Sequence, residues 1–475
     1  MITLRPYQNE VVERVRDAFT RHKRVCLQVP TGGGKTIISA YMISNAIAKG
    51  NKVLFLVHLR ELIDQTSAKL ELFNVKHGFI ASGYPTNDEM CQLAMIQTLN
   101  RWIDKIDFVP DFIVVDEFHH SCSKQYQKVI ERFPEAKLIG LTATPIRLDG
   151  KGLKQFADVL VQGPDVKRLI ADGFLNGYEY YSVPSKLDLS DVKIKMGEFE
   201  AKSLERALER ADIVGDCVAH YQRYLAGKKA IVFCARVKYS HQVVAQFEAA
   251  GIRAAHLDGE MSKQDRLATI NRFRNGEIQV LSNCSLISEG FDVPDCDGVI
   301  MLRPTKSLGL FLQMVGRGLR PSANKTIILD HVRNHEEHGL PCDVREWALT
   351  DKKVKGGTIS VSVCQDCFAV FNGRRCGACG SERVVKIKEN KSKPIVPIEL
   401  VQVTIGNTST TIEKKKGSYQ QSEVNKLLRQ CKTNDDFYRL AKQLGYQQGW
   451  AYNRINAREK KRNRFAKDLG YRVFR

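Results

Sequence analysis

A glycine-rich loop between a strand and a helix constrains this chain most. The apolar run Val25 to Val29 leads into Pro30-Thr31-Gly32-Gly33-Gly34-Lys35-Thr36, and a helical pattern follows from Ile37. Glycines let backbone N–H groups converge on phosphate oxygens, and the N-terminus of the next helix adds its dipole. Lys35 would reach the β- and γ-phosphates, and the Thr36 hydroxyl would ligate magnesium. The loop therefore predicts a triphosphate site in an α/β sheet, formed with Thr31, Gly32, Gly33 and Gly34. Val29 replaces the first glycine of the general pattern, and a plain flexible turn stays open as the alternative.

A pair of acids follows a second apolar strand. Phe112 to Val115 ends in Asp116-Glu117, so both carboxylates lie at the carboxyl end of a strand, where α/β sheets bind ligands. Asp116 can hold magnesium through water, and Glu117 can position and deprotonate an attacking water. Such a pair alone is often a solvated turn. Together with the upstream phosphate loop, it indicates a nucleoside-triphosphatase.

Two segments of the chain alternate strand-like and helical runs, the pattern of parallel βαβ units. The first half has this rhythm, and it resumes from about Lys229 with Ala230 to Cys234, Ile278 to Ser282, Gly298 to Met301 and Thr326 to Leu329. We expect two α/β lobes, with Glu198 to Arg223 as a charged helical stretch between them. The predicted organisation is lobe 1 at 1–165, a connection at 166–225, lobe 2 at 226–349, a zinc ribbon at 358–385 and a basic C-terminal region at 386–475.

Composition favours a polyanionic partner. The 475 residues contain 73 Lys and Arg against 53 Asp and Glu, a net charge of +20. No apolar run approaches the roughly 18 residues of a membrane span. Most of the thirteen cysteines stand singly in apolar segments, as expected of buried thiols in a reducing cytosol. These features predict a soluble, unexported protein that binds nucleic acid and no membrane.

The order of the motifs resembles that of superfamily 2 helicases over roughly residues 2–335. The resemblance implies two RecA-like lobes, with ATP in the cleft between them and DNA across them. The matching elements are Arg5-Pro-Tyr-Gln8 for adenine recognition, Gly32 to Thr36 (motif I), Asp116-Glu117-Phe118-His119 (motif II), Leu141 to Pro145 (motif III), Ser288 to Pro294 (motif V) and Gln313 to Arg320 (motif VI).

The resemblance also implies residue roles. Arg317 and Arg320 would be arginine fingers that reach the triphosphate only when the lobes close, which makes hydrolysis conditional on closure. Being three apart, they share a face if the segment is helical, although a plain basic helix face is the alternative. The other implied roles are catalysis for Lys35, Glu117 and Gln313, nucleotide binding for Arg5, Gln8, Gly290 and Asp292, and coupling for His119, Thr142 and Thr144.

Contacts to the nucleic-acid backbone are implied for Arg60, Gln97 and Thr98. Each can donate to a phosphate, although Arg60 at a helix start is also compatible with ordinary solvated charge. Phe118 replaces the alanine that is usual in motif II, which leaves the subfamily open. The nearest resemblance is to RadD-like helicases of bacteria and phages.

Two further features lie after lobe 2. Cys364-x-x-Cys367 and Cys376-x-x-Cys379 have the spacing of a tetrahedral structural zinc site, with disulfides or unliganded thiols as alternatives. From Arg454 to Arg475, nine Lys or Arg stand against Glu459 and Asp468, with aromatic residues between them. Such a segment suits phosphate contact and base stacking, although a solvated tail is equally compatible.

The sequence therefore predicts an ATP-dependent DNA helicase or translocase that unwinds or remodels branched DNA in replication, recombination or repair. An RNA helicase is the alternative within the class, and an ATP-gated clamp without processive movement is the alternative outside it. The expected cofactors are ATP, magnesium and zinc. The expected partners are single-stranded, forked or branched DNA and single-strand-binding or recombination proteins. The expected location is the cytoplasm of a bacterial or phage-infected cell, in association with the nucleoid.

Overall fold

The computed structural model describes most of the chain up to residue 350 and short stretches beyond it. The described residues are 3–121, 123–147, 152–183, 189, 191–195, 198–209, 213–284, 296–322, 324–350, 362–363, 370–371, 375, 380, 401–403 and 433–443. They fall into two compact units, 1–406 and 407–475. In the described part of the second unit, α14 (Asn434–Gln443) begins after Thr433, whose hydroxyl accepts the Asp436 N–H at 3.3 Å.

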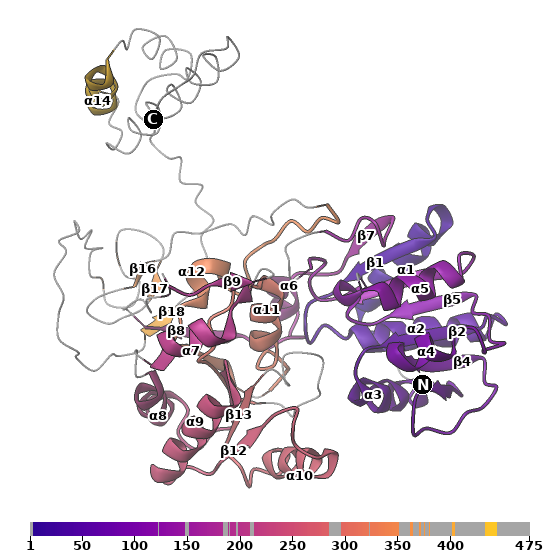
Figure 1. The fold of residues 1–475 in the computed structure, drawn as a ribbon, viewed down its shortest axis with the longest axis horizontal. Coiled ribbons are helices and arrows are strands. Elements are labelled where there is room, and N and C mark those ends of the chain that lie inside the picture. Colours follow the sequence, from indigo (N-terminus) through magenta and orange to yellow (C-terminus); the bar gives the residue numbers. More distant parts are fainter. Residues whose placement is uncertain are drawn as a thin grey trace, which may run out of the picture. The chain divides into compact units, whose positions relative to one another are not determined.

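Lobe 1 is a parallel sheet with helices around it (Figure 1). Its strand order is β3-β4-β2-β5-β6-β1-β7, and every pairing in it is parallel. The strands are β1 (Arg24–Gln28), β2 (Val53–Val57), β3 (Gly78–Ile80), β4 (Cys91–Met95), β5 (Phe112–Val115), β6 (Lys137–Thr142) and β7 (Val159–Gln162). The helical segments are α1 (Pro6–Arg21), α2 (Lys35–Ile47), α3 (Arg60–Glu71), α4 (Ile96–Trp102), the short η1 (Phe118–His120) and α5 (Lys124–Arg132).

Lobe 2 repeats this architecture. Its sheet runs β12-β13-β11-β14-β15-β8 with parallel pairings and continues through β18, β17 and β16, where β18 is antiparallel to β8. The strands are β8 (Tyr178–Ser182), β11 (Ala230–Cys234), β12 (Ala254–Leu257), β13 (Val280–Cys284), β14 (Gly298–Met301), β15 (Thr326–Asp330), β16 (Ser362–Val363), β17 (Val370–Phe371) and β18 (Val401–Val403). The helices are α7 (Ala201–Glu209), α8 (Ile213–Tyr224), α9 (Val237–Ala249), α10 (Lys263–Arg274), α11 (Leu308–Gly316) and α12 (Asn334–His338).

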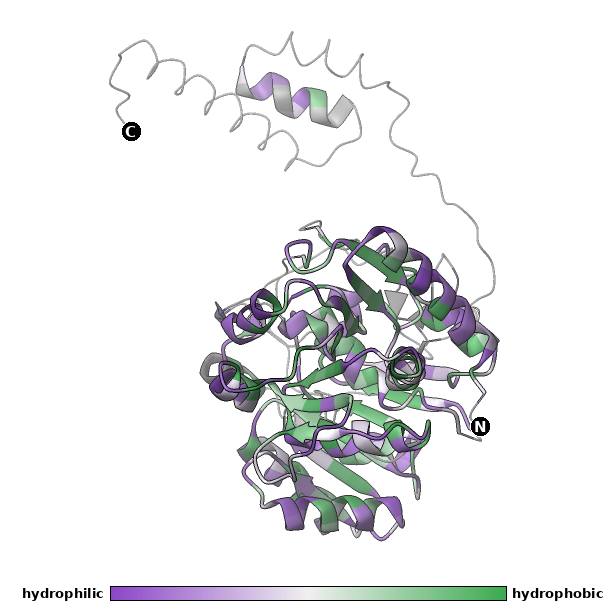
Figure 2. Cartoon of the chain, turned by 90° about the vertical axis from the view of Figure 1, so that its right-hand side faces the viewer, coloured by the Kyte–Doolittle hydropathy of each residue, from purple (hydrophilic) through white to green (hydrophobic). Residues whose placement is uncertain are grey.

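The central strands of both sheets are apolar, which suits their parallel pairing. All residues of β2, β5, β11 and β14 are buried, as expected for strands covered on both faces. Figure 2 shows apolar residues concentrated in the strands and polar residues along the outer helices. None of the described helices is long and apolar enough to cross a membrane.

The segment between the lobes differs from the expected plain connection. After α6 (Val166–Ala171), strand β8 enters the lobe 2 sheet beside β15. The stretch expected to be one charged helix begins with β10 (Glu198–Phe199), which pairs with β9 (Ile194–Lys195), and continues as α7 and α8. The chain thus passes from lobe 1 to lobe 2 between β7 and β8.

A second passage leads back from lobe 2 to lobe 1. After α12, the Trp347 carbonyl accepts a hydrogen bond from Nε2 of Gln162 at 3.0 Å, and the Leu349 carbonyl accepts the Lys154 N–H at 2.9 Å. The Leu349 side chain is buried in the core of lobe 1. The lobes are therefore joined by the chain twice.

Candidate nucleotide site between the two lobes

The glycine-rich loop is shaped by two left-handed residues. Gly32 has a φ of 80° and Gly34 a φ of 77°, where a side chain is disfavoured. A side-chain carbon on Gly34 would also lie 2.5 Å from Nε2 of Gln8. The Tyr7 hydroxyl donates to the Gly33 carbonyl at 2.9 Å, and Lys35 opens α2 directly after the loop. The loop therefore directs the N-terminus of α2 as a phosphate site requires.

The predicted adenine-recognition residues lie against this loop. Oε1 of Gln8 accepts the Arg5 N–H at 2.9 Å at the start of α1. The Arg5 guanidinium lies 4.8 Å from the centre of the Phe174 ring, which is 5.1 Å from the Tyr7 ring. Sequence reasoning missed Phe174, because it stands between α6 and β8 without any motif around it.

The acidic pair is buried at the end of β5. Burial raises the pKa of Asp116 above its usual range, and the neighbouring Glu117 adds to this effect. Burial would also raise the pKa of Glu117, but Lys35 and His119 outweigh it and lower that pKa. Glu117 has a left-handed φ of 47°, an unfavourable conformation for a side chain of this kind. Its Oε2 has no hydrogen-bond partner among the described residues. A buried, charged and unsatisfied carboxylate oxygen is what a water-activating base needs.

Three histidines gather around Glu117. Nδ1 of His119 lies 3.5 Å from Oε2 of Glu117, and the rings of His58 and His120 lie 4.6 Å apart. Burial lowers the pKa of both His58 and His119 to about 4, so both are neutral at pH 7. Sequence reasoning missed His58 and His120 as neighbours of Glu117. His58 follows β2 and His120 follows β5, and only the adjacency of these strands brings them together.

Motif III links this cluster to lobe 2. Nδ1 of His119 lies 3.3 Å from Oγ1 of Thr142. The Thr142 hydroxyl donates to the Thr144 carbonyl at 2.8 Å and accepts the Thr144 N–H at 3.1 Å. The backbone of α11 passes close to Thr144 at Gly309. If Gly309 carried a side chain, its Cβ would lie 2.9 Å from Oγ1 of Thr144. A continuous series of contacts therefore runs from Glu117 to lobe 2.

The motif VI arginines lie beyond α11, not within it. Gln313 is buried in the helix, which ends at Gly316, with buried Arg317 as its C-cap and half-buried Arg320 in the following turn. The condition for a shared helix face, a helical segment through both arginines, is therefore not met. A side-chain carbon on Gly318 would lie 2.5 Å from Cγ2 of Thr326, so the chain leaves the helix to pack against β15.

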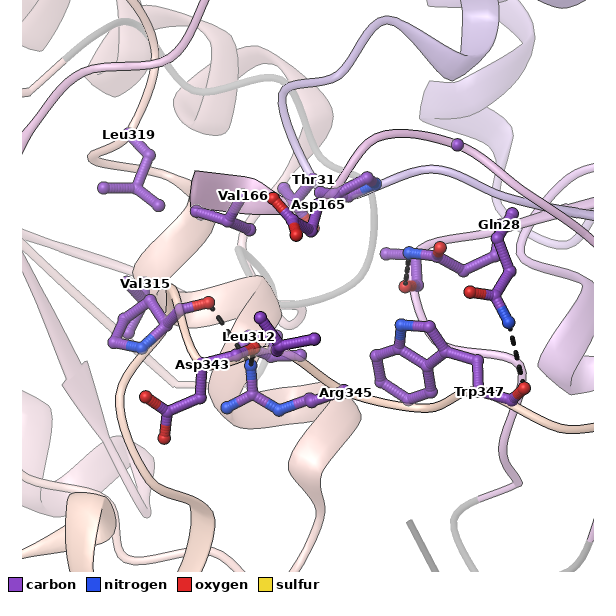
Figure 3. Close-up of a pocket in the computed structure, with 17 residues that line it drawn as sticks. Gln28, Thr31, Asp165, Val166, Leu312, Val315, Leu319, Asp343, Arg345 and Trp347 are labelled. Atoms are coloured by element: carbon purple, nitrogen blue, oxygen red, sulfur yellow. Dashed lines mark hydrogen bonds between the residues drawn. The ribbon is translucent and has the colours of Figure 1, made fainter. Parts of the chain in front are cut away.

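The phosphate loop and α11 approach each other closely. A side-chain carbon on Gly316 would lie 2.5 Å from Cβ of Thr31. Beside this contact is a cavity of about 180 Å³. Figure 3 shows it between Thr31, Leu312, Val315 and Trp347. Both lobes therefore line one space next to the phosphate loop.

Comparison with known proteins decides the family. Residues 1–147 match the model of the type III restriction enzyme res subunit, and residues 211–322 match the helicase conserved C-terminal domain. A 51.5 kDa protein of a Lactococcus phage is 36% identical over 402 residues, which cover 82% of this chain and 85% of the phage protein. The chain belongs to the superfamily 2 helicases. It is an ATP-dependent enzyme of that family, as expected, whereas the RadD-like subgroup stays a prediction.

Two further similarities agree with this family. IRC3 of Saccharomyces cerevisiae, named as an ATP-dependent helicase, is 30% identical over 354 residues, 70% of this chain and 50% of IRC3. The chain thus spans about half the length of that relative. A solved fragment of an HsdR subunit of a type I restriction enzyme from Vibrio vulnificus has a TM-score of 0.56 at 22% identity, over 72% of this chain and 68% of that one. The likeness extends to the fold of both lobes.

The predicted nucleic-acid residues of the helicase differ in exposure. Arg60 is exposed at the start of α3, with its guanidinium 5.2 Å from the Tyr84 ring centre. Half-buried Gln97 donates from Nε2 to the His58 carbonyl at 3.1 Å, and Thr98 is only 5% exposed. The structure therefore places Arg60 at the surface, Gln97 against the histidine cluster and Thr98 in the interior.

Several predicted residues lie outside the described part of the helicase. They are Gly290 and Asp292 of motif V, the cysteines Cys364, Cys367, Cys376 and Cys379, and the basic segment 454–475. The strands on either side of Cys364 and Cys367, β16 and β17, pair antiparallel.

Proposed function

We propose that this helicase hydrolyses ATP between its lobes to move along DNA, and that it unwinds or remodels branched duplexes. The observation that supports this proposal most directly is the close approach of the phosphate loop to α11, at Thr31 and Gly316. Lobe 1 carries the lysine and the acidic pair, and the chain after α11 carries the arginines. Neither lobe has the complete set, so hydrolysis would require both.

The residues present suit ATP with magnesium. Lys35 and the glycine loop would hold the phosphates, and Thr36 and Asp116 would hold the ion, which neutralises phosphate charge when bound. The lowered pKa of Glu117 keeps this carboxylate charged at pH 7, ready to accept a proton from water. Neutral His119 would orient Glu117 without taking its charge.

The contacts from Glu117 through His119, Thr142 and Thr144 to Gly309 support coupling between hydrolysis and lobe movement. A shift of α11 against Thr144 would move Thr142 and His119, because these residues touch in series. Hydrolysis would then respond to the position of lobe 2.

DNA is the proposed polymer. The model matched by residues 1–147 describes a subunit of a restriction enzyme, a class that acts on DNA. Exposed Arg60 suits backbone phosphates, which would give grip without sequence readout. RNA as the track, or a clamp that binds without processive movement, are the alternatives.

A structural zinc site at Cys364, Cys367, Cys376 and Cys379 is a further part of the proposal. The antiparallel pairing of β16 with β17 supports a hairpin around the first cysteine pair. Metal analysis of protein never exposed to a chelator should find one zinc per chain, and none in the quadruple Cys→Ser variant. Wild-type protein that contains no zinc would contradict the proposed zinc site.

The function is tested by ATP hydrolysis measured in parallel with single-stranded DNA, blunt duplex, forked DNA and RNA of matched sequence. A strand-displacement assay on the fork accompanies it. We expect the largest stimulation and ATP-dependent displacement with forked DNA. Stimulation by RNA and not by DNA would indicate that the helicase moves along RNA. Stimulation by DNA without strand displacement or translocation would favour a clamp that binds without processive movement.

A further inference from the structure

Three consecutive residues after Gly173, namely Phe174, Leu175 and Asn176, touch three different parts of the nucleotide site. They lie between α6 and β8, where the chain crosses from lobe 1 to lobe 2. Gly173 has a left-handed φ of 73°, so the chain turns at this point. We call Phe174–Asn176 the hinge tripeptide.

The first two residues of the hinge tripeptide face lobe 1. The Phe174 ring lies under the Arg5 guanidinium, at 4.8 Å. A side-chain carbon on Gly32 would lie 2.8 Å from Cδ2 of Leu175, which is itself only 3% exposed. Leu175 therefore packs on the phosphate loop at a residue whose φ also favours glycine.

The third residue holds the chain after α11. The Asn176 N–H donates to the Leu319 carbonyl at 2.8 Å, and its Nδ2 donates to Oγ of Ser322 at 2.8 Å and to the Asn324 carbonyl. These three acceptors bracket Arg320, one residue before it and two and four residues after it. Asn176 thus ties down the backbone on both sides of a predicted arginine finger.

The segment before the hinge tripeptide is fixed to lobe 1. Arg168 in α6 forms an ion pair with Glu10 of α1 at 3.0 Å, and a side-chain carbon on Gly33 of the phosphate loop would lie 3.5 Å from Cδ1 of Leu169. A rotation of the lobes would therefore be absorbed after this segment, where Leu175 packs on the phosphate loop of lobe 1 and Asn176 bonds to the motif VI exit of lobe 2.

We propose that Asn176 is a positioning residue for Arg320: its side-chain amide holds the motif VI exit so that the arginine meets the triphosphate when the lobes close. This rests on the proposed function, because it assumes that Arg320 acts on ATP bound to lobe 1. Asn176 itself touches no reacting group. Its effect should appear in turnover and not in ATP affinity.

A double-mutant cycle separates positioning from mere structural support. Asn176→Ala, or Asn176→Asp if the alanine variant is unstable, removes the side-chain donors. We expect single-turnover ATP hydrolysis to fall about tenfold while the ATP dissociation constant changes less than about twofold. In the Arg320→Ala background, the same change at Asn176 should have no further effect. Asn275→Ala, an exposed asparagine in lobe 2, is the matched control and should behave as wild type.

The outcomes are distinguishable. A tenfold loss that persists in the Arg320→Ala background, or no loss at all in the single variant, would overturn the positioning role. Normal hydrolysis by Arg320→Ala alone would instead contradict the proposed function at this residue. Thermal unfolding midpoints within the range of the Asn275→Ala control confirm that the variants are folded.

Discussion

The two lobes have one architecture and different chemistry, as the chain after the first central strand of each lobe shows. After β1, residues 29–34 form a loop with two left-handed glycines before α2 begins. After β11, only Ala235 and Arg236 precede α9, and Arg236 has an extended backbone with a φ of −146°. A connection of two residues cannot wrap a phosphate chain. The proposed triphosphate site therefore lies in lobe 1, although both lobes share the same fold.

The charged residues of the sequence motifs are also divided between the lobes. Lobe 1 buries Asp116 and Glu117 at the end of β5, whereas lobe 2 buries Arg317 at the end of α11. This difference supports the proposal that hydrolysis requires both lobes and that neither lobe is sufficient alone.

Glu117→Gln should have the largest effect. The amide keeps the shape of the side chain but cannot accept a proton from water, so turnover should fall about 10²- to 10⁴-fold with ATP affinity retained. Steady-state hydrolysis and equilibrium ATP binding measure the two quantities. Glu135→Gln is the matched control, since Glu135 is exposed and pairs with Lys23, away from the nucleotide site. Near-normal turnover in Glu117→Gln would contradict the claim that lobe 1 supplies the base that activates water.

Low pH should reduce the free energy of unfolding because of a buried histidine in lobe 2. Burial, with His220 nearby, lowers the pKa of His331 from 6.5 to about 3. Between about pH 6.5 and pH 3 this histidine binds a proton in the unfolded chain but stays neutral in the folded chain. The free energy of unfolding therefore falls as pH drops through this range, by at most about 1.4 kcal/mol per pH unit. Above pH 6.5 this residue contributes no pH dependence.

The thermal unfolding midpoint should therefore decrease less between pH 7.5 and pH 5.5 in His331→Leu than in the wild-type protein. The exposed His241→Leu should keep the wild-type slope. Equal slopes in all three proteins would mean that His331 is protonated in the fold.

Arg266→Gln should have the smallest effect. Arg266 of α10 pairs with Glu61 of α3 at 3.0 Å, which joins the lobes beside Arg60. A partly exposed ion pair contributes about 0.2–1 kcal/mol, so nucleic-acid-stimulated hydrolysis should fall no more than about fivefold. Arg272→Gln on the same helix, whose partner Glu277 is in lobe 2, is the control and should leave the rate unchanged. A much larger loss for Arg266→Gln would show that this contact, and not ATP, holds the lobes together.

Sequence patterns predicted the parallel lobes because their strands are short and apolar. Phe112–Val115, Ala230–Cys234 and Gly298–Met301 are strands over the predicted residues. Strands β4 and β8 were missed, since Gln92, Glu179 and Tyr residues give them mixed polarity. Local pattern cannot show that a polar residue is covered by a neighbouring strand.

The candidate site was predicted where a motif is continuous in sequence and missed where tertiary contacts build it. Lys35, Asp116 and Glu117 stand in local motifs, whereas Phe174 and His58 reach the site through the hinge and through strand adjacency. The end of α11 at Gly316 also depends on the remote packing of Gly318 on β15.

The central claim is tested most directly by ATP affinity and single-turnover hydrolysis of Lys35→Ala and Arg317→Ala, measured side by side with saturating forked DNA. Lys35→Ala should lose about 10- to 100-fold in affinity, because the phosphates lose a charged hydrogen-bond donor in lobe 1. Arg317→Ala should bind ATP nearly as wild type and lose about 10³-fold in hydrolysis, because lobe 2 acts on the transition state. Equal losses of affinity in both variants, with hydrolysis of bound ATP intact in Arg317→Ala, would contradict the account.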